Sequence, residues 1–331
     1  MISAFNRKNW NLDINGERQF WKEKLLNIFI NVPEACPHCK MGKIHLKNNE
    51  SIINPVLGKC TNYKCKQELY FRIGSIFEKH NITPASIIYQ ILDFWLNYDL
   101  NGNKICDKLK DLYNHECLNK IFILNILQEF RIYIANYMRD YYCLESIAKK
   151  NEWHHVAIDE CLFTHQDGIQ NWVIGLINTE TNIIRLEVVT SRDTETMKNI
   201  IHKHVEPGNY IVSDAWPAYN FLDQENNNYI HHVYNHNRGN FGRGYDSTSR
   251  IESVWNELKL LFKKIYVTIR SKNFIFFLRE IEYRRSIKGL TSKEKLENFA
   301  TLFNCVGVRE KKDYLSEFEL ISLVYETNFD D

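Results

Sequence analysis

The spacing of apolar residues divides the first half of the chain into three regions. Residues 17–32, ERQFWKEKLLNIFINV, have apolar positions at helical spacing and predict a short amphipathic helix. Residues 36–77 consist of short strand-like pieces separated by turn residues. Helical spacing returns from Thr83 to about Lys150, beginning with a proline in a first-turn position. The first half therefore predicts a small β module between helical regions.

At Trp153 the apolar period changes from the helical value towards two. Three strands are predicted in succession, followed by helix, strand, short helix, strand and two longer helices. Their segments are HHVAIDECLF, NWVIGLINTET, NIIRLEVVTSR, TETMKNIIHKHV, NYIVSDAW, PAYNFLD, YIHHVYN, RIESVWNELKLLFKKIYV and KNFIFFLREIEYRRSIK. This order predicts an α/β fold, a mixed sheet flanked by helices as in the RNase H-like fold.

These changes of pattern predict five parts in a chain of 331 residues. They are an N-terminal helix (1–30), a cysteine-rich ribbon (31–80), a helical, helix-turn-helix-like region (81–150), an RNase H-like domain (151–290) and an acidic C-terminal tail (291–331).

The formal net charge is +1, so the whole molecule carries no strong field. The charge is unevenly distributed, however: residues 238–288 hold twelve Lys or Arg against five Asp or Glu, and residues 291–331 hold five against nine. The basic segment suits a phosphate-binding face, and a solvated helical face is an equally good explanation. The N-terminus has no apolar signal core and no segment reaches a membrane-spanning length, so we expect a protein that is not secreted.

Four of the nine cysteines have the spacing of a zinc ribbon. Cys36 and Cys39 form a C-x2-C pair, and Cys60 and Cys65 follow as a wider C-x4-C pair. Two such pairs on short hairpins predict one structural, tetrahedral Zn2+. Because the second pair is wide, His38 and His45 remain alternatives to Cys65 as the fourth zinc ligand. The simpler alternative is that the four cysteines are unrelated free thiols that bind no metal.

Three acidic residues carry the predicted chemistry: Asp159 and Asp214 at strand ends, and Glu252 in the first turn of a helix. Each alone is most simply a turn or cap residue. If the strands are neighbours in the sheet, the three carboxylates converge and repel one another unless divalent cations neutralise them. A carboxylate cluster holding two metals is suited to in-line attack on a phosphodiester. The hypothesis is therefore a metal-dependent DNA-processing site.

Polar residues near the third acid are candidate DNA contacts. Asn256 and Lys259 follow Glu252 on the same helix face, while Arg250 precedes it and Arg243 lies in the glycine-rich segment NRGNFGRGYDSTSR. A solvated lysine explains Lys259 equally well. Glu160 is expected to point away from Asp159 along the strand, and to be structural.

The aromatic residues and histidines near the acids in the sequence can each be explained by a functional or by a structural role. Trp216 and Tyr219 could stack on a base or simply pack a short helix. His231, His232 and His236 are more simply structural than catalytic.

Taken together, these motifs resemble the DDE transposases of the Merlin group and their bacterial insertion-sequence relatives, which have an ISXO-like domain. The similarity runs through CPHC and YFRIGSIFEKHNI, VAIDECLF, IVSDAWPAY, and SRIESVWNELK with FLREIEYRR. The chain departs from the family in its C-x4-C pair and in Thr248, Ser249 and Arg250 at the helix start.

The resemblance implies that Asp159, Asp214 and Glu252 bind two Mg2+ or Mn2+ ions. It implies cleavage and strand transfer of double-stranded DNA at terminal inverted repeats, with the ribbon and residues 81–150 reading the DNA, and a homodimer. The protein would act in the nucleus of a eukaryote, or in the cytoplasm and nucleoid of a bacterium. A domesticated, non-catalytic DNA-binding copy and a host RNase H-like nuclease are the alternatives.

Overall fold

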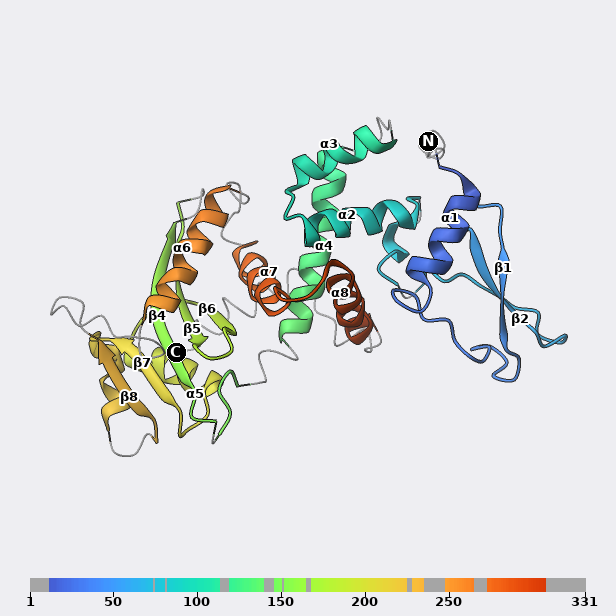
Figure 1. Cartoon of the computed structure of the whole chain (residues 1–331). Coiled ribbons are helices and arrows are strands. Elements are labelled where there is room, and N and C mark those ends of the chain that lie inside the picture. The colour runs from blue at the N-terminus through green and yellow to red at the C-terminus, as the bar shows by residue number, and fades with distance from the viewer. Residues whose placement is uncertain are drawn as a thin grey trace. The chain divides into compact units, whose positions relative to one another are not determined.

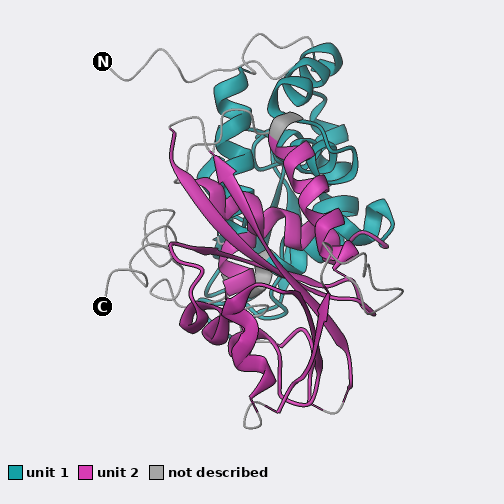
Figure 2. Ribbon diagram, turned by 90° about the vertical axis from the view of Figure 1, so that its left-hand side faces the viewer, with its two compact units in different colours: residues 1–133, 290–314 teal, residues 134–289, 315–331 magenta. Residues whose placement is uncertain are grey.

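The computed structural model describes residues 12–307, except 74, 81, 114–118, 140–145, 151, 165–167, 225–227, 235–247 and 265–272. The chain forms two compact units (Figure 1, Figure 2). Unit 1 comprises residues 1–133 and 290–314, and unit 2 comprises residues 134–289 and 315–331.

Unit 1 begins with helix α1 (Ile14–Phe20), which continues into the π-helical turn η1 (Trp21–Leu25). The Asp13 side chain caps α1 by accepting a hydrogen bond from the backbone N–H of Gly16 at 2.8 Å. The sequence predicted a helix as far as residue 32, and this was wrong beyond Leu25. The helix ends at Leu26, whose backbone is extended, and Asn27 with a φ of 66° then begins a tight turn that brings Leu26 and Ile30 together in a β-bridge.

The cysteine-rich segment forms a three-stranded antiparallel sheet with strand order β1-β2-β3. The strands are β1 (Ile44–Asn48), β2 (Val56–Cys60) and β3 (Glu68–Leu69). Two of the predicted zinc ligands precede β1, Cys60 is the last residue of β2, and Cys65 lies in the connection to β3.

A short 3-10 helix, η2 (Glu78–His80), leads to the helical part of unit 1. Its helices are α2 (Ala85–Asn97), α3 (Gly102–Tyr113), α4 (Lys120–Tyr137), which crosses the boundary between the units, and α8 (Ser292–Gly307). The ring of Phe130 packs edge-on against Phe299 and lies 5.7 Å from the ring of Trp95. Helix α8 lies in the segment predicted as an acidic tail and belongs to unit 1. The five-part division of the chain stays a prediction.

Unit 2 is built on a five-stranded sheet with strand order β6-β5-β4-β7-β8. The first three strands form an antiparallel meander, and β7 and β8 run parallel to β4. The strands are β4 (His155–Thr164), β5 (Gln170–Asn178), β6 (Ile184–Val189), β7 (Tyr210–Asp214) and β8 (Ile230–Tyr234). This mixed order is that of the RNase H-like fold, and it confirms the predicted fold class.

Each face of the sheet is buried by its own helices. One face packs under α6 (Ser249–Lys264) and α7 (Phe274–Ser286), and Figure 1 shows α6 lying along β4. The other face packs under α5 (Thr194–His204) and the 3-10 helix η4 (Pro217–Asp223). Side chains alternate along β4, so Ala157 and Cys161 face α6 while Val156 and Ile158 face α5.

A buried ionic network joins the edge strand β6 to helices on both faces. Arg279 of α7 donates to the carbonyl of Leu186 at 2.9 Å and pairs with Glu282, whose carboxylate accepts from the N–H of Leu186. On the same strand, Glu187 accepts from His204 of α5 at 2.6 Å and lies 3.5 Å from Arg279. The network satisfies the polar groups of an edge strand that would otherwise be exposed.

None of the helices in the described ranges has the length and apolar character needed to cross a membrane.

Candidate active site

The side chains of Asp159 and Glu160, consecutive residues of strand β4, point to opposite faces of the sheet. Asp159 faces α6, where its Oδ2 accepts a hydrogen bond from the indole Nε1 of Trp255 at 2.9 Å. Glu160 faces the other helices, where it accepts from the hydroxyl of Tyr219 in η4. The opposite orientation of Glu160 follows from the alternation of side chains along a strand.

The second acid lies level with the first. Ala157 pairs with Val212 in the parallel register, so Asp159, two residues further along β4, is level with Asp214 on β7. The neighbouring position of these two strands was predicted from their order in the sequence. Asp214 is half-buried and its Oδ1 accepts from the backbone N–H of Trp216 at 2.9 Å, which fixes the turn into η4.

Glu252 reaches the same region from the first turn of α6. Its Oε1 accepts from the hydroxyl of Thr248 at 2.9 Å. Burial raises the pKa of Asp159 to about 6, the Trp255 hydrogen bond opposes this, and the nearby charges of Asp214 and Glu252 raise it further. Asp214 and Glu252 therefore each lie close enough to Asp159 to act on its carboxylate.

The acids are near one another but are not drawn together around a common point. Among the residues that the structure describes, the four cysteines are the only group of three or more His, Cys, Asp or Glu side chains arranged closely enough to hold an ion. Asp159, Asp214 and Glu252 each have one carboxylate oxygen engaged with a neighbouring donor. Their hard oxygen donors and their mutual repulsion fit divalent cations such as Mg2+.

Helix α6 runs beside β4 and sets the positions of the predicted DNA contacts. Lys259 interacts with the thiol of Cys161, which lies two residues beyond Asp159 on the same face of β4. Asn256 is exposed. Arg250 donates instead to Asn182 at 2.9 Å, in the turn between β5 and β6. Arg243 lies outside the described residues.

The histidines of β8 have contacts typical of structural residues. The buried ring of His231 bonds to Ser213 through Nε2 and to Asp223 through Nδ1, both at 2.8 Å. His232 packs edge-on against Tyr210. His236 lies outside the described residues.

The four predicted zinc ligands come together in unit 1. All four Sγ atoms lie within 4.8 Å of one another, with Cys36 and Cys65 3.8 Å apart and Cys39 and Cys60 3.6 Å apart. A tetrahedron with Zn–S bonds of about 2.3 Å has S···S edges of about 3.8 Å. The spacing of the sulfur atoms therefore fits one Zn2+.

Backbone N–H groups favour a thiolate at Cys39, whereas burial raises the pKa of the Cys60 thiol to about 12. The N–H of Gly42 donates to Cys39 at 3.5 Å and that of Asn62 to Cys60 at 3.4 Å. The N–H groups of Gly42 and Met41 lower the pKa of the Cys39 thiol to about 6. His38 lies 3.7 Å from Cys65 Sγ, whereas His45 is exposed on β1. Among the described residues, the cysteines rather than a histidine complete the set.

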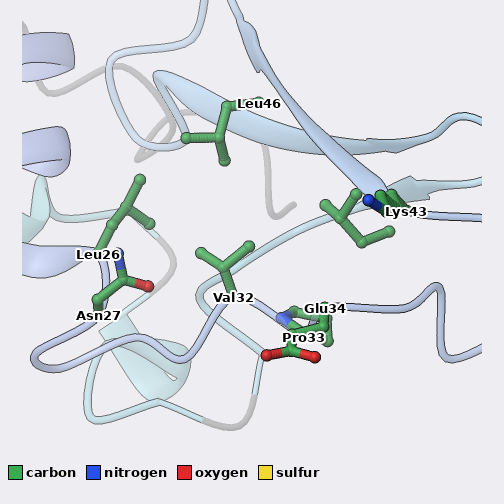
Figure 3. Close-up of a pocket in the computed structure, with 8 residues that line it drawn as sticks. Leu26, Asn27, Val32, Pro33, Glu34, Lys43 and Leu46 are labelled. Atoms are coloured by element: carbon green, nitrogen blue, oxygen red, sulfur yellow. The ribbon is translucent and has the colours of Figure 1, made fainter.

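Unit 1 also has a pocket of about 480 Å³ between residues 26–34 and strand β1. Figure 3 shows Leu26 and Val32 opposite Leu46, with Lys43 and Glu34 at one side. The pocket is lined by none of the acids or cysteines described above.

Two features of the site were not predicted from the sequence. The first is the hydrogen bond from Trp255 to Asp159. The sequence feature that points to Trp255 is its position three residues after Glu252, on the buried face of the helix. Arg192, in the segment between β6 and α5, lies over the rings of Trp172 and Trp216, and no sequence pattern pointed to it.

Distant structural likenesses are to retroviral integrases. A chain of the simian T-cell lymphotropic virus intasome in complex with PP2A regulatory subunit B56 gamma has 12% identity and a TM-score of 0.31, over 59% of this chain and 66% of that one. The HTLV-2 integrase catalytic core domain in complex with magnesium, in its dimeric form, has 11% identity and a TM-score of 0.25, over 51% of this chain and 96% of that one. Likenesses this weak carry no argument about function.

No curated protein matches the chain. Residues 164–286 match the family of the ISXO2-like transposase domain. The matched range contains Asp214 and Glu252 and begins after Asp159 and the cysteine cluster. This match over 164–286 confirms the resemblance seen in the sequence motifs for that part of the chain.

Proposed function

We propose that the protein is a DDE transposase that cleaves DNA at the terminal inverted repeats of a mobile element and joins the freed strand to target DNA. The observation that carries the proposal is the approach of Asp159, Asp214 and Glu252 from two parallel strands and a helix. The transposase-domain match over residues 164–286 supports it independently.

Asp159, Asp214 and Glu252 would hold two Mg2+ or Mn2+ ions. When bound, such ions activate the attacking hydroxyl group and stabilise the leaving oxygen of the phosphodiester. The protein itself orients the carboxylates: Trp255 holds Asp159, the turn at Trp216 holds Asp214, and Thr248 holds Glu252. Fixed carboxylates keep the reacting groups in one geometry.

Contacts to the DNA backbone would come from the basic residues around α6. Lys259 lies on the Asp159 side of β4, and Asn256 is exposed one turn after Glu252. Arg250 would have to leave Asn182 to reach DNA, and Arg243 would contact the DNA backbone from the glycine-rich segment. Phosphate contacts of this kind position the duplex without reading its sequence.

The four cysteines would hold one structural Zn2+, because four thiolates leave no open position for chemistry. The resulting ribbon and helices α2–α4 would recognise the element ends, and two copies of the chain would bring two ends together.

The test is strand cleavage of a duplex carrying the inverted repeats that flank the gene, with Mg2+ and with EDTA. Wild-type protein should cut only with Mg2+, and Asp214→Asn should lower cutting by at least about a hundredfold. Asp223→Asn, which removes an exposed carboxylate in η4, should cut normally. Equal cutting by wild type and Asp214→Asn would overturn the metal assignment. DNA binding without cutting would favour the non-catalytic alternative.

A further inference from the structure

A guanidinium group lies over two indole rings near Asp214. The Cζ of Arg192 is 3.5 Å from the ring centre of Trp172 and 5.0 Å from that of Trp216. The three residues come from β5, from the segment before α5 and from the turn after β7. Arginine stacks favourably on tryptophan faces, so the three side chains form one cation–π stack.

This stack is linked to one of the three acids, Asp214, and to Glu160. The backbone N–H of Trp216 donates to Oδ1 of Asp214 at 2.9 Å. Nη1 of Arg192 lies 3.9 Å from Oε2 of Glu160, the residue next to Asp159. A group bound on the stack would therefore lie at the same edge of the sheet as Asp214, on the face opposite the Asp159 carboxylate.

The outer part of the stack remains accessible. Trp216 is 42% exposed and the Arg192 side chain is 29% exposed, whereas Trp255 on the other face is buried. Exposure alone would mean little, because Trp153 is 57% exposed and has no such connection to an acid. What distinguishes Trp216 is an exposed indole, a stacked cation and a direct bond to Asp214 in one place.

We propose that Trp216 and Arg192 bind one unpaired nucleotide of the DNA strand that enters the acidic site. The base would stack on the exposed indole, and the guanidinium would contact the phosphate of the same nucleotide. A base paired inside a duplex has both faces covered by its neighbours, so an unpaired base, which can turn out of the stack, is the one that can lay a face on Trp216. This inference rests on the proposed function, since it assumes that DNA is the substrate.

The simpler explanation is packing alone, in which Arg192 covers Trp172 and the exposure of Trp216 has no role. The two explanations differ in what they predict for DNA. Packing predicts equal affinity for blunt and unpaired ends, whereas a nucleotide site predicts a preference that disappears when the base is removed.

The experiment uses the full chain with Ca2+ in place of Mg2+, so that binding is measured without cutting. The probes are a blunt duplex, the same duplex with one unpaired 2-aminopurine at its 3′ end, and that duplex with an abasic residue there. Wild-type protein should bind the unpaired end more tightly than the other two and quench its fluorescence. Trp216→Ala should weaken that binding by roughly 5- to 100-fold, the usual range for loss of one stacked base.

Two variants separate stacking from loss of structure. Trp216→Phe should retain quenching and most of the affinity, because phenylalanine also stacks. Trp153→Ala removes an exposed tryptophan elsewhere in unit 2 and should behave as wild type. Arg192→Gln should weaken binding of the unpaired and abasic ends alike, because it removes the phosphate contact.

Equal affinity of wild type for unpaired and abasic ends, or full quenching by Trp216→Ala, would overturn the nucleotide site. If Mg2+-dependent cleavage is retained in that case, the proposed function stands and this inference alone fails. Absence of any DNA binding by the wild type would overturn both.

Discussion

The indole of Trp255 and the carboxylate of Asp159 are joined by a hydrogen bond of 2.9 Å across 96 positions of the sequence. This bond fixes the rotation of α6 against β4. Because Glu252 is on the first turn of the same helix, the position of the third acid depends on the contact that holds the first.

Trp255→Phe should keep most of the ring packing and remove the hydrogen bond to Asp159. We expect the free energy of unfolding to fall by about 1–2 kcal/mol, and cleavage to fall much further because Asp159 loses its orientation. Trp255→Ala should cost about 3–5 kcal/mol, because it also leaves a cavity. Denaturant unfolding and cleavage of one duplex, measured in parallel, check this. Normal cleavage by Trp255→Phe would show that the bond does not position Asp159.

Gly175 on β5 leaves room for the Trp255 ring. A Cβ at this position would lie 2.5 Å from Cη2 of Trp255 and 2.9 Å from Cδ1 of Ile251, both in the buried interface. Gly175→Ala should therefore displace α6, lower the free energy of unfolding by about 1–3 kcal/mol and impair cleavage with all three acids intact. Gly289→Ala is the matched control, since a Cβ there meets no atom within 4 Å. Equal effects of the two substitutions on stability and cleavage would contradict this account.

Zinc content tests the cysteine cluster. We expect about one Zn2+ per chain by mass spectrometry, lost in Cys36→Ser, Cys39→Ser, Cys60→Ser and Cys65→Ser. Cys106→Ser changes a buried cysteine outside the cluster and should retain the metal. If Cys65→Ser keeps zinc and His38→Ala loses it, then His38 is the fourth ligand and the assignment of Cys65 is wrong.

Glu17 should make unit 1 sensitive to pH. It is 4% exposed in α1, accepts from the hydroxyl of Ser86, and burial raises its pKa to about 7 from 4.5. The folded state therefore holds a proton that the unfolded chain releases. The resulting stability is fully present below pH 4.5 and is lost as the pH rises through 7, a change of up to about 3 kcal/mol.

Glu17→Gln should flatten this dependence and protect α1 and α2 above pH 7. Hydrogen exchange of the α1 and α2 amides at pH 5 and pH 8, corrected for intrinsic rates, measures how the stability of these helices depends on pH. Glu23→Gln, an exposed substitution in η1, should follow the wild type. An unchanged pH dependence in Glu17→Gln would exclude Glu17 as its source.

The order of strands was predictable because apolar periods of two are a local signal, and a parallel pair follows from the intervening helix. The RNase H-like fold that this order indicates has the strands of Asp159 and Asp214 as neighbours. The bond from Trp255 was not predictable, because it depends on the rotation of α6 about its axis. The same holds for Arg192, whose two aromatic neighbours come from separate segments. The helical pattern of residues 17–32 predicted a helix that is too long, because the chain turns at Asn27 despite the apolar spacing.

The most direct test of the central claim is to locate manganese in crystals of the protein grown with Mn2+, using anomalous scattering. The account predicts peaks at about 2.0–2.6 Å from carboxylate oxygens of Asp159, Asp214 and Glu252, with the three side chains moved towards a common point. Peaks that are absent there, or carboxylates that remain apart with manganese bound elsewhere, would contradict it.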